Sequence, residues 1–117
     1  MADCIFCKIV AKQIPAKVVY EDAEVLAFED LNPQAPTHLL VIPRKHIATL
    51  NDLAAEDEAL LGKLHRAGAA IARTRGIAGS GWRAVMNVNR DAGQSVFHLH
   101  LHVLGGKPMG WPPFPAA

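Results

Sequence analysis

Three histidines in the segment SVFHLHLHVLGG, residues 95–106, occupy every second position and alternate with apolar residues. His98, His100 and His102 would share one face of a β-strand, because successive side chains of a strand point to opposite sides. Leu99, Leu101 and Val103 would share the other face, which suits a hydrophobic core. A solvent-exposed face has no need of three imidazoles, since serine, threonine or lysine would serve equally well. We therefore interpret the row of histidines as functional.

Two chemistries use clustered imidazoles. One is metal binding, because a His-x-His pair on a strand can hold zinc. The outer two histidines would lie about 13 Å apart at their Cα atoms. All three rings could then reach one ion at about 2 Å only if the strand twists strongly. The other chemistry is nucleophilic and acid–base catalysis near neutral pH, where histidine titrates. In that case the middle ring would attack while its neighbours bind, orient and protonate, and we favour this interpretation.

The elements that must position these histidines form an α+β pattern. Apolar residues at helical offsets predict a short helix over 4–11 and a long helix over 56–75, which Gly76 ends. Strands are expected over 18–20, 25–28, 38–42 and 82–88 and over the histidine segment. Hairpin connections are favoured over βαβ crossovers, so we expect a five-stranded, mainly antiparallel sheet with one long and one short helix.

Composition narrows the possible classes of protein. The 117 residues are expected to form a single domain, residues 1–117, in which the proline-rich residues 107–117 are an extended C-terminal tail. A net charge of +1 argues against a nucleic-acid partner. No apolar run approaches the roughly 20 residues that span a membrane. The N-terminus lacks the pattern of a signal peptide, so a cytoplasmic location is expected.

Further segments accompany the histidines and make a family resemblance apparent. The sequence His-Leu-His-Leu-His-Val-Leu resembles the signature of the histidine triad (HIT) superfamily. The accompanying segments, IPAK (14–17), QAPTH (34–38), VIP (41–43), LLG (60–62), GQSV (93–96) and WPP (111–113), are similar to its HINT branch of purine nucleoside phosphoramidases. The resemblance covers nearly the whole chain in the expected order. It implies a HIT-like fold and a homodimer with a ten-stranded sheet, in which each tail reaches toward the partner's active site. The alternative is that the tail folds back on its own chain.

The resemblance also implies a reaction. His100 would attack the α-phosphorus of a purine nucleoside phosphoramidate, such as AMP joined to lysine or another amine, and water would hydrolyse the nucleotidyl-histidine. His102 would contact the phosphate and, with His38, complete a proton-relay and orienting network, while Ser95 would donate to the phosphate or the leaving group. The implied catalytic residues are His100, His102, His38, Ser95 and His98. No cofactor is required for this chemistry, and the substrate is a small purine nucleotide.

The implied nucleotide contacts come from several segments. Asp30 would accept hydrogen bonds from the ribose hydroxyls, and Asn87, expected on a neighbouring strand, would hold the phosphate or ribose. Backbone N–H groups near Gly93, Gln94 and Val96 would meet the phosphate oxygens. The side chains implied to flank the base are Ile5, Phe6, Phe28, Leu31 and Ile42. The alternatives are that Phe6 and Ile42 belong only to the core and that Asp30 simply begins a turn.

The two cysteines form a Cys-x-x-Cys pair, Cys4 and Cys7, which is too small for a disulfide framework and is weak evidence alone. Some superfamily members hold a structural zinc ion with such a pair and two histidines, which here would be His46 and His98. Two thiolates and two imidazoles make a plausible tetrahedral set. The alternative is a pair of reduced thiols without a metal.

Two other functions compete with the phosphoramidase interpretation. They are a dinucleoside polyphosphate hydrolase and a zinc- or nucleotide-binding regulatory protein with incidental catalysis.

Overall fold

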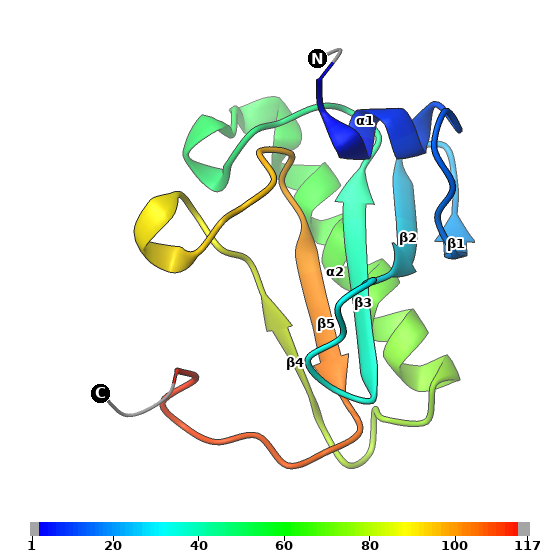
Figure 1. Ribbon diagram of the computed structural model, residues 1–117, viewed down its shortest axis with the longest axis vertical. Helices are drawn as coiled ribbons and strands as arrows, with labels where there is room; N and C mark the ends of the chain where they lie inside the picture. Colours follow the sequence, from blue (N-terminus) through cyan, green and yellow to red (C-terminus); the bar gives the residue numbers. More distant parts are fainter. Residues whose placement is uncertain (1–2, 115–117) are drawn as a thin grey trace.

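The chain folds into one antiparallel sheet with a long helix on one face and a short helix over part of the other, as a computed structural model describes for residues 3–114 (Figure 1). The sheet order is β1-β2-β3-β5-β4. Its strands are β1 (Val18–Glu21), β2 (Val25–Glu29), β3 (Thr37–Pro43), β4 (Trp82–Val85) and β5 (Leu101–Gly105). The helices are α1 (Ile5–Val10) and α2 (Glu58–Thr74), and the 3₁₀ helices are η1 (Leu50–Asp52), η2 (Ala55–Asp57) and η3 (Arg90–Ala92). The expected α+β class with a five-stranded antiparallel sheet is confirmed.

Two strands differ by more than one residue from the expected bounds. The strand predicted over 82–88 ends at Val85, so Asn87 lies beyond it. The histidine strand begins only at Leu101, and residues 98–100 are outside the sheet ladder. Strand β3 ends at Pro43, which has no N–H to donate to a longer ladder. The N–H of Leu99 instead donates to the carbonyl of Ile47 at 2.7 Å.

The α2 face of the sheet carries the larger core. One stripe of α2 packs against the alternating apolar residues of β3 and β5; its buried members are Leu60, Leu64, Ala67 and Ile71, facing Leu39, Val41, Leu101 and Val103. Gly68 permits this close approach, because a Cβ atom there would lie 3.3 Å from a methyl group of Val103. The helix begins at Glu58 rather than 56, after the η2 turn. It ends before Gly76, which takes a left-handed conformation with φ of 74°.

The short helix α1 covers the other face at one end of the sheet. Its N-cap is Cys4, whose Sγ accepts a hydrogen bond from the Cys7 N–H at 3.3 Å. Phe6 and Ile9 point into a second apolar cluster with side chains of β2 and β3. The helix therefore brings both cysteines and an aromatic ring to the face that carries the histidines.

The segment after β5 has no helix or strand over residues 107–114, and residues 115–117 of the expected tail lie outside the described part. Arg83 of β4 holds this segment, because its Nη2 donates to the carbonyl of Gly110 at 2.8 Å. Trp111 and Phe114 are exposed. Within residues 3–114 there is no helix with the length and apolarity to cross a membrane.

Candidate active site

The three motif histidines lie on the sheet face opposite α2, although two of them precede β5. The ring centroids of His100 and His102 are 4.9 Å apart. The Phe6 ring lies edge-on to both His98 and His100, at 5.9 Å and 5.2 Å. Leu99, Leu101 and Val103 are buried in the α2 core instead, as the alternation predicts.

His98 is directed at the cysteines. Its Nε2 lies 2.7 Å from the carbonyl oxygen of Pro43. A carbonyl only accepts, so Nε2 carries the proton and Nδ1 has the lone pair. That Nδ1 is 3.4 Å from the Cys4 sulfur and 3.6 Å from the Cys7 sulfur. Burial lowers the pKa of His98, which keeps the ring neutral.

His100 has the opposite tautomer. Its Nδ1 donates to the carbonyl oxygen of His98 at 2.8 Å, so the lone pair is on Nε2. Among the described residues, every buried side-chain nitrogen and oxygen has a hydrogen-bond partner. The Nε2 of His100 makes no hydrogen bond with the described part of the protein and is therefore accessible from solvent. Burial lowers the pKa of His100, so this nitrogen is free to act as a nucleophile at neutral pH.

His102 belongs to a chain of hydrogen bonds that begins at the Gln34 backbone. The Gln34 N–H donates to Nδ1 of His38 at 2.9 Å, so the proton of His38 is on Nε2. That Nε2 lies 2.9 Å from Nδ1 of His102 and 3.3 Å from a carboxylate oxygen of Asp30. His102 accepts at Nδ1 and so carries its proton on Nε2. Burial, followed by the charges of His100 and His38, lowers the pKa of His102 to about 4.

The loop between β4 and the histidines carries the residues expected to meet a phosphate. Gly93 takes a left-handed conformation with φ of 82°, and Ser95 is exposed beside it. Gln94 is buried, and its side chain bonds to backbone groups rather than pointing outward. Asn87 is half-buried. The expected phosphate residues thus lie in one loop, but Gln94 has its side chain turned into the protein.

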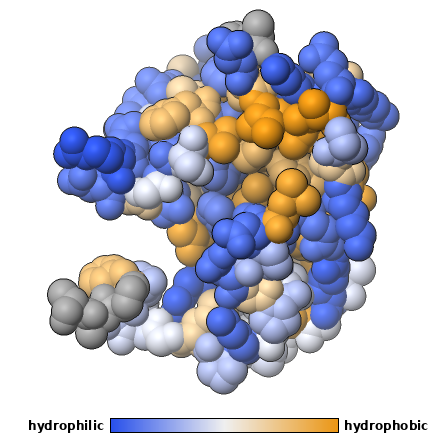
Figure 2. Space-filling model, viewed as in Figure 1, coloured by the Kyte–Doolittle hydropathy of each residue, from blue (hydrophilic) through white to orange (hydrophobic). Residues whose placement is uncertain are grey.

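The residues expected to flank a base divide into two groups. Phe6, Phe28 and Ile42 form the second apolar cluster with Leu26 and Leu40, and Val96 packs against it. Figure 2 shows apolar surface gathered around α1 on this face. Ile5 and Leu31 lie outside the cluster and expose 48% and 97% of their surface. The structure therefore brings three of the five expected side chains together beside the imidazoles.

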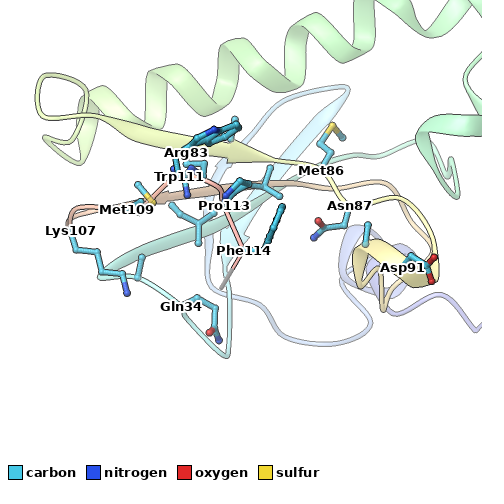
Figure 3. Close-up of a pocket in the computed structure, with 15 residues that line it drawn as sticks. Gln34, Arg83, Met86, Asn87, Asp91, Lys107, Met109, Trp111, Pro113 and Phe114 are labelled. Atoms are coloured by element: carbon cyan, nitrogen blue, oxygen red, sulfur yellow. The ribbon is translucent and has the colours of Figure 1, made fainter. Parts of the chain in front are cut away.

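A cavity of about 830 Å³ is lined by residues of β4, β5 and the segment that follows β5. Val85, which is paired with His102 across the β4–β5 ladder, lines its floor together with Leu104. Figure 3 shows Asn87 and Asp91 at one end of the cavity, with Lys107 and Met109 of the tail segment at the other.

Sequence reasoning missed the residues of this cavity that lie on β4 and on the tail. It also missed the backbone groups that set the tautomers. The alternation of side chains along β4 could have placed Arg83 and Val85 on the histidine face. The backbone carbonyl and N–H groups that set the histidine tautomers could not have been found, because they leave no signal in the residue types.

Cys4, Cys7, His46 and His98 form a compact cluster of potential metal ligands, with their four donor atoms within 4.8 Å of one another. Nδ1 of His46 is 3.3 Å from the Cys7 sulfur. A tetrahedral zinc ion with bonds of about 2.0–2.3 Å separates its ligand atoms by roughly 3.3–3.8 Å, which agrees with these contacts. The bond from His98 to Pro43 also leaves the correct nitrogen free and fixes the ring, as the outer partners of metal-bound histidines do.

Comparison with known proteins places this geometry in a family. A family model described as "Scavenger mRNA decapping enzyme C-term binding" matches residues 3–111. The histidine motif, the antiparallel sheet and these matches show that the chain belongs to the histidine triad (HIT) family. A purine nucleoside phosphoramidase of Escherichia coli (strain K12) is 50% identical over 108 residues, which cover 92% of this chain and 91% of that protein.

Solved structures agree with this assignment. A HIT family hydrolase from Legionella pneumophila is 52% identical with a TM-score of 0.94, and the match covers 96% of this chain and all of that one. A histidine triad protein from Clostridium difficile is 44% identical with a TM-score of 0.91, over 94% of this chain and 96% of that one.

Proposed function

We propose that this protein is a hydrolase that cleaves the P–N bond of purine nucleoside 5′-phosphoramidates through a nucleotidyl-histidine intermediate. The observation that carries the proposal is the state of His100. Its Nδ1–H is held by a backbone carbonyl at 2.8 Å, while Nε2 is unprotonated and accessible. The resemblance to a curated purine nucleoside phosphoramidase along nearly the whole chain supports this reaction class.

The reaction has two displacement steps at phosphorus. In the first, the lone pair on Nε2 of His100 forms a bond to the α-phosphorus as the P–N bond breaks, and the amine departs with a proton taken from solvent. In the second, a water oxygen attacks phosphorus, the bond to Nε2 breaks and one proton is released. The net products are the nucleoside monophosphate and the free amine. The proton on Nε2 of His102 and the N–H groups of the loop at Ser95 would stabilise the charge on the phosphoryl oxygens.

His38 is assigned an orienting role within this proposal. Its Nδ1 already accepts the Gln34 N–H, so surrendering the Nε2 proton would leave an imidazolate beside the Asp30 carboxylate. Burying two like charges side by side is unfavourable. His38 therefore holds the tautomer of His102 rather than passing a proton through it. Oδ1 of Asp30 accepts the Asn32 N–H at 2.8 Å, and the carboxylate keeps further lone pairs for ribose hydroxyls.

The two halves of the substrate have separate places beside the histidines. The apolar cluster that contains Phe6, Phe28 and Ile42 suits a purine base. The cavity lined by Val85 and Asn87 suits the leaving amine, because Val85 is the ladder partner of His102. This arrangement would place the phosphorus between the two, at His100.

We also propose that Cys4, Cys7, His46 and His98 hold a structural zinc ion. The donor set, the spacing and the fixed His98 ring support this assignment. Bound zinc would join α1 to the segment before β5 and would deprotonate the thiols. Burial raises the pKa of the Cys7 thiol, so the metal would also be needed for its ionisation at neutral pH. The hydrolysis itself requires no metal in this scheme.

We further propose that residues 1–117 form one domain, which acts as a homodimer with a joined sheet in the cytoplasm, without a nucleic-acid or membrane partner. The exposed Trp111 and Phe114 support an interface role for the tail. The two cysteines are free thiols, which suits a reducing compartment.

The test is turnover of adenosine 5′-monophosphoramidate by the wild type and by His100→Ala, both treated with a chelator. His65→Ala is the matched control, because His65 is an exposed histidine on α2. We expect AMP release by the wild type and the control, and a loss of at least about a thousandfold for His100→Ala. Retention of activity by His100→Ala would overturn the mechanism. Faster cleavage of a dinucleoside polyphosphate than of the phosphoramidate would favour the competing activity.

A further inference from the structure

We propose that Gln94 is a positioning residue, which holds the loop of residues 89–98 in place for the phosphate and does not itself touch the nucleotide. This inference rests on the proposed function, because it assigns the loop to the phosphoryl group. The family resemblance implied that the Gln94 N–H meets the phosphate, but this N–H donates to the Asn89 carbonyl at 3.1 Å. The side-chain amide of Gln94 also makes its bonds inside the protein.

The amide group of Gln94 is fully used inside the protein. Its Oε1 accepts the Asn89 N–H at 2.8 Å, and its Nε2 donates to the carbonyls of Ala48 and Val96 at 2.9 and 3.1 Å. Only one orientation of the amide satisfies one N–H donor and two carbonyl acceptors. The residue is 7% exposed, so water does not compete for these bonds. Both Nε2 protons are engaged, and neither is left for a phosphate oxygen.

Gln94 also holds the beginning of the loop, at Asn89. The Gln94 N–H donates to the Asn89 carbonyl at 3.1 Å, so Asn89 and Gln94 are joined by two hydrogen bonds, one of them through the side chain. Asn89 has a positive φ of 63°, a conformation that a residue with a side chain rarely adopts. A backbone of this kind persists where its surroundings hold it. Gln94 supplies that support.

The loop is tied at two points to one short backbone segment. Gln94 bonds to the carbonyl of Ala48, and the Leu99 N–H bonds to the carbonyl of Ile47 at 2.7 Å. Residues 95–98 are therefore anchored at both ends to neighbouring residues of the segment that follows β3. His100 comes directly after the second anchor. The two bonds consequently fix the position of the Ser95 and Val96 amides relative to the nucleophile, which is the preorganisation that phosphoryl transfer requires.

Two variants separate the bonds that Gln94 makes. Gln94→Glu keeps the shape and one acceptor but replaces the two donated bonds with repulsion between oxygens. Gln94→Met keeps the approximate volume and removes all three bonds, and so provides a second variant if the first folds poorly. Gln13→Glu makes the same charge change at an exposed glutamine and is the control.

The measurements are hydrogen exchange of the ligand-free protein over residues 89–98 and the dissociation constants of AMP and adenosine. We expect faster exchange in the loop for both Gln94 variants and normal exchange for the control. AMP should bind roughly tenfold more weakly to the variants. Adenosine, which lacks the phosphate, should bind within about twofold of wild type.

Three results would overturn the inference. Unchanged loop exchange with weaker AMP binding would mean that Gln94 contacts the nucleotide directly. Equal weakening of AMP and adenosine would mean that it supports the whole site rather than the phosphate loop. Unchanged AMP binding would mean that the loop does not depend on it. A wild-type protein that binds no AMP would instead count against the proposed function, and the exchange data would still decide whether Gln94 holds the loop.

Discussion

The backbone carbonyl of His98 accepts the Nδ1–H of His100 at 2.8 Å, so the first histidine of the motif fixes the proton of the second through its main chain. The imidazole of His98 meanwhile faces the two cysteines. One residue therefore contributes to two sites, with its carbonyl directed at the nucleophile and its ring at the cluster of sulfur ligands.

The tautomer of His100 can be measured directly. We expect the ¹⁵N chemical shifts of its ring to show a protonated Nδ1 and an unprotonated Nε2 across neutral pH, because the carbonyl bond and the lowered pKa both favour that form. His65→Ala and His100→Ala spectra would assign the signals. A His100 ring protonated on Nε2 would contradict the proposed nucleophile.

His38→Ala should impair the chemical step more than binding. The substitution leaves Nδ1 of His102 without its donor and the Gln34 N–H without its acceptor. His102 could then carry its proton on either nitrogen, so we expect kcat to fall about 10- to 100-fold with KM changed by less than about threefold. Steady-state kinetics with the phosphoramidate would check this. A rise in KM at constant kcat would place His38 in substrate binding instead.

The lowered pKa of His102 should make the free energy of unfolding fall in acid. The pKa of His102 is about 4 in the folded protein and near 6.5 in the unfolded chain. Between these values the unfolded state binds more protons, so the free energy of unfolding falls as the pH is lowered from 6.5 towards 4. Urea unfolding of the wild type and of His102→Gln would isolate the effect, because the variant should lose less stability across that interval. Parallel curves would contradict the lowered pKa.

Loss of the metal should lower the thermal stability of the protein while leaving its turnover intact. We expect one zinc ion per chain, lost in Cys7→Ser, with a fall in thermal midpoint of at least about 5 °C. Below the midpoint the variant should retain turnover, because the bond from His100 to the His98 carbonyl is not made by the cysteine. Metal analysis and thermal unfolding give the two readouts. A metal-free wild-type protein, purified without chelator, would refute the zinc assignment.

Local patterns predicted more of the fold than of the site. The alternation from His98 to Val103 was sufficient to predict which side chains enter the core, since side-chain direction depends on the neighbouring residues. It could not predict that the strand starts at Leu101, because pairing depends on where the distant β3 ends at Pro43. The bonding partner of the Gln94 side chain could not be predicted for the same reason, because Ala48 lies 46 residues away in the sequence.

Main-chain groups set the proton positions of three histidines: the Pro43 carbonyl for His98, the His98 carbonyl for His100 and the Gln34 N–H for His38. Each of these groups belongs to the main chain and is present with any residue at these positions, except that a proline at residue 34 would lack the N–H. Substitution at residue 34 can therefore alter the surface without altering the acid–base state of the site, provided that the chain follows the same path. The tautomers of these three rings are therefore set by the path of the main chain and not by the side chains that surround them.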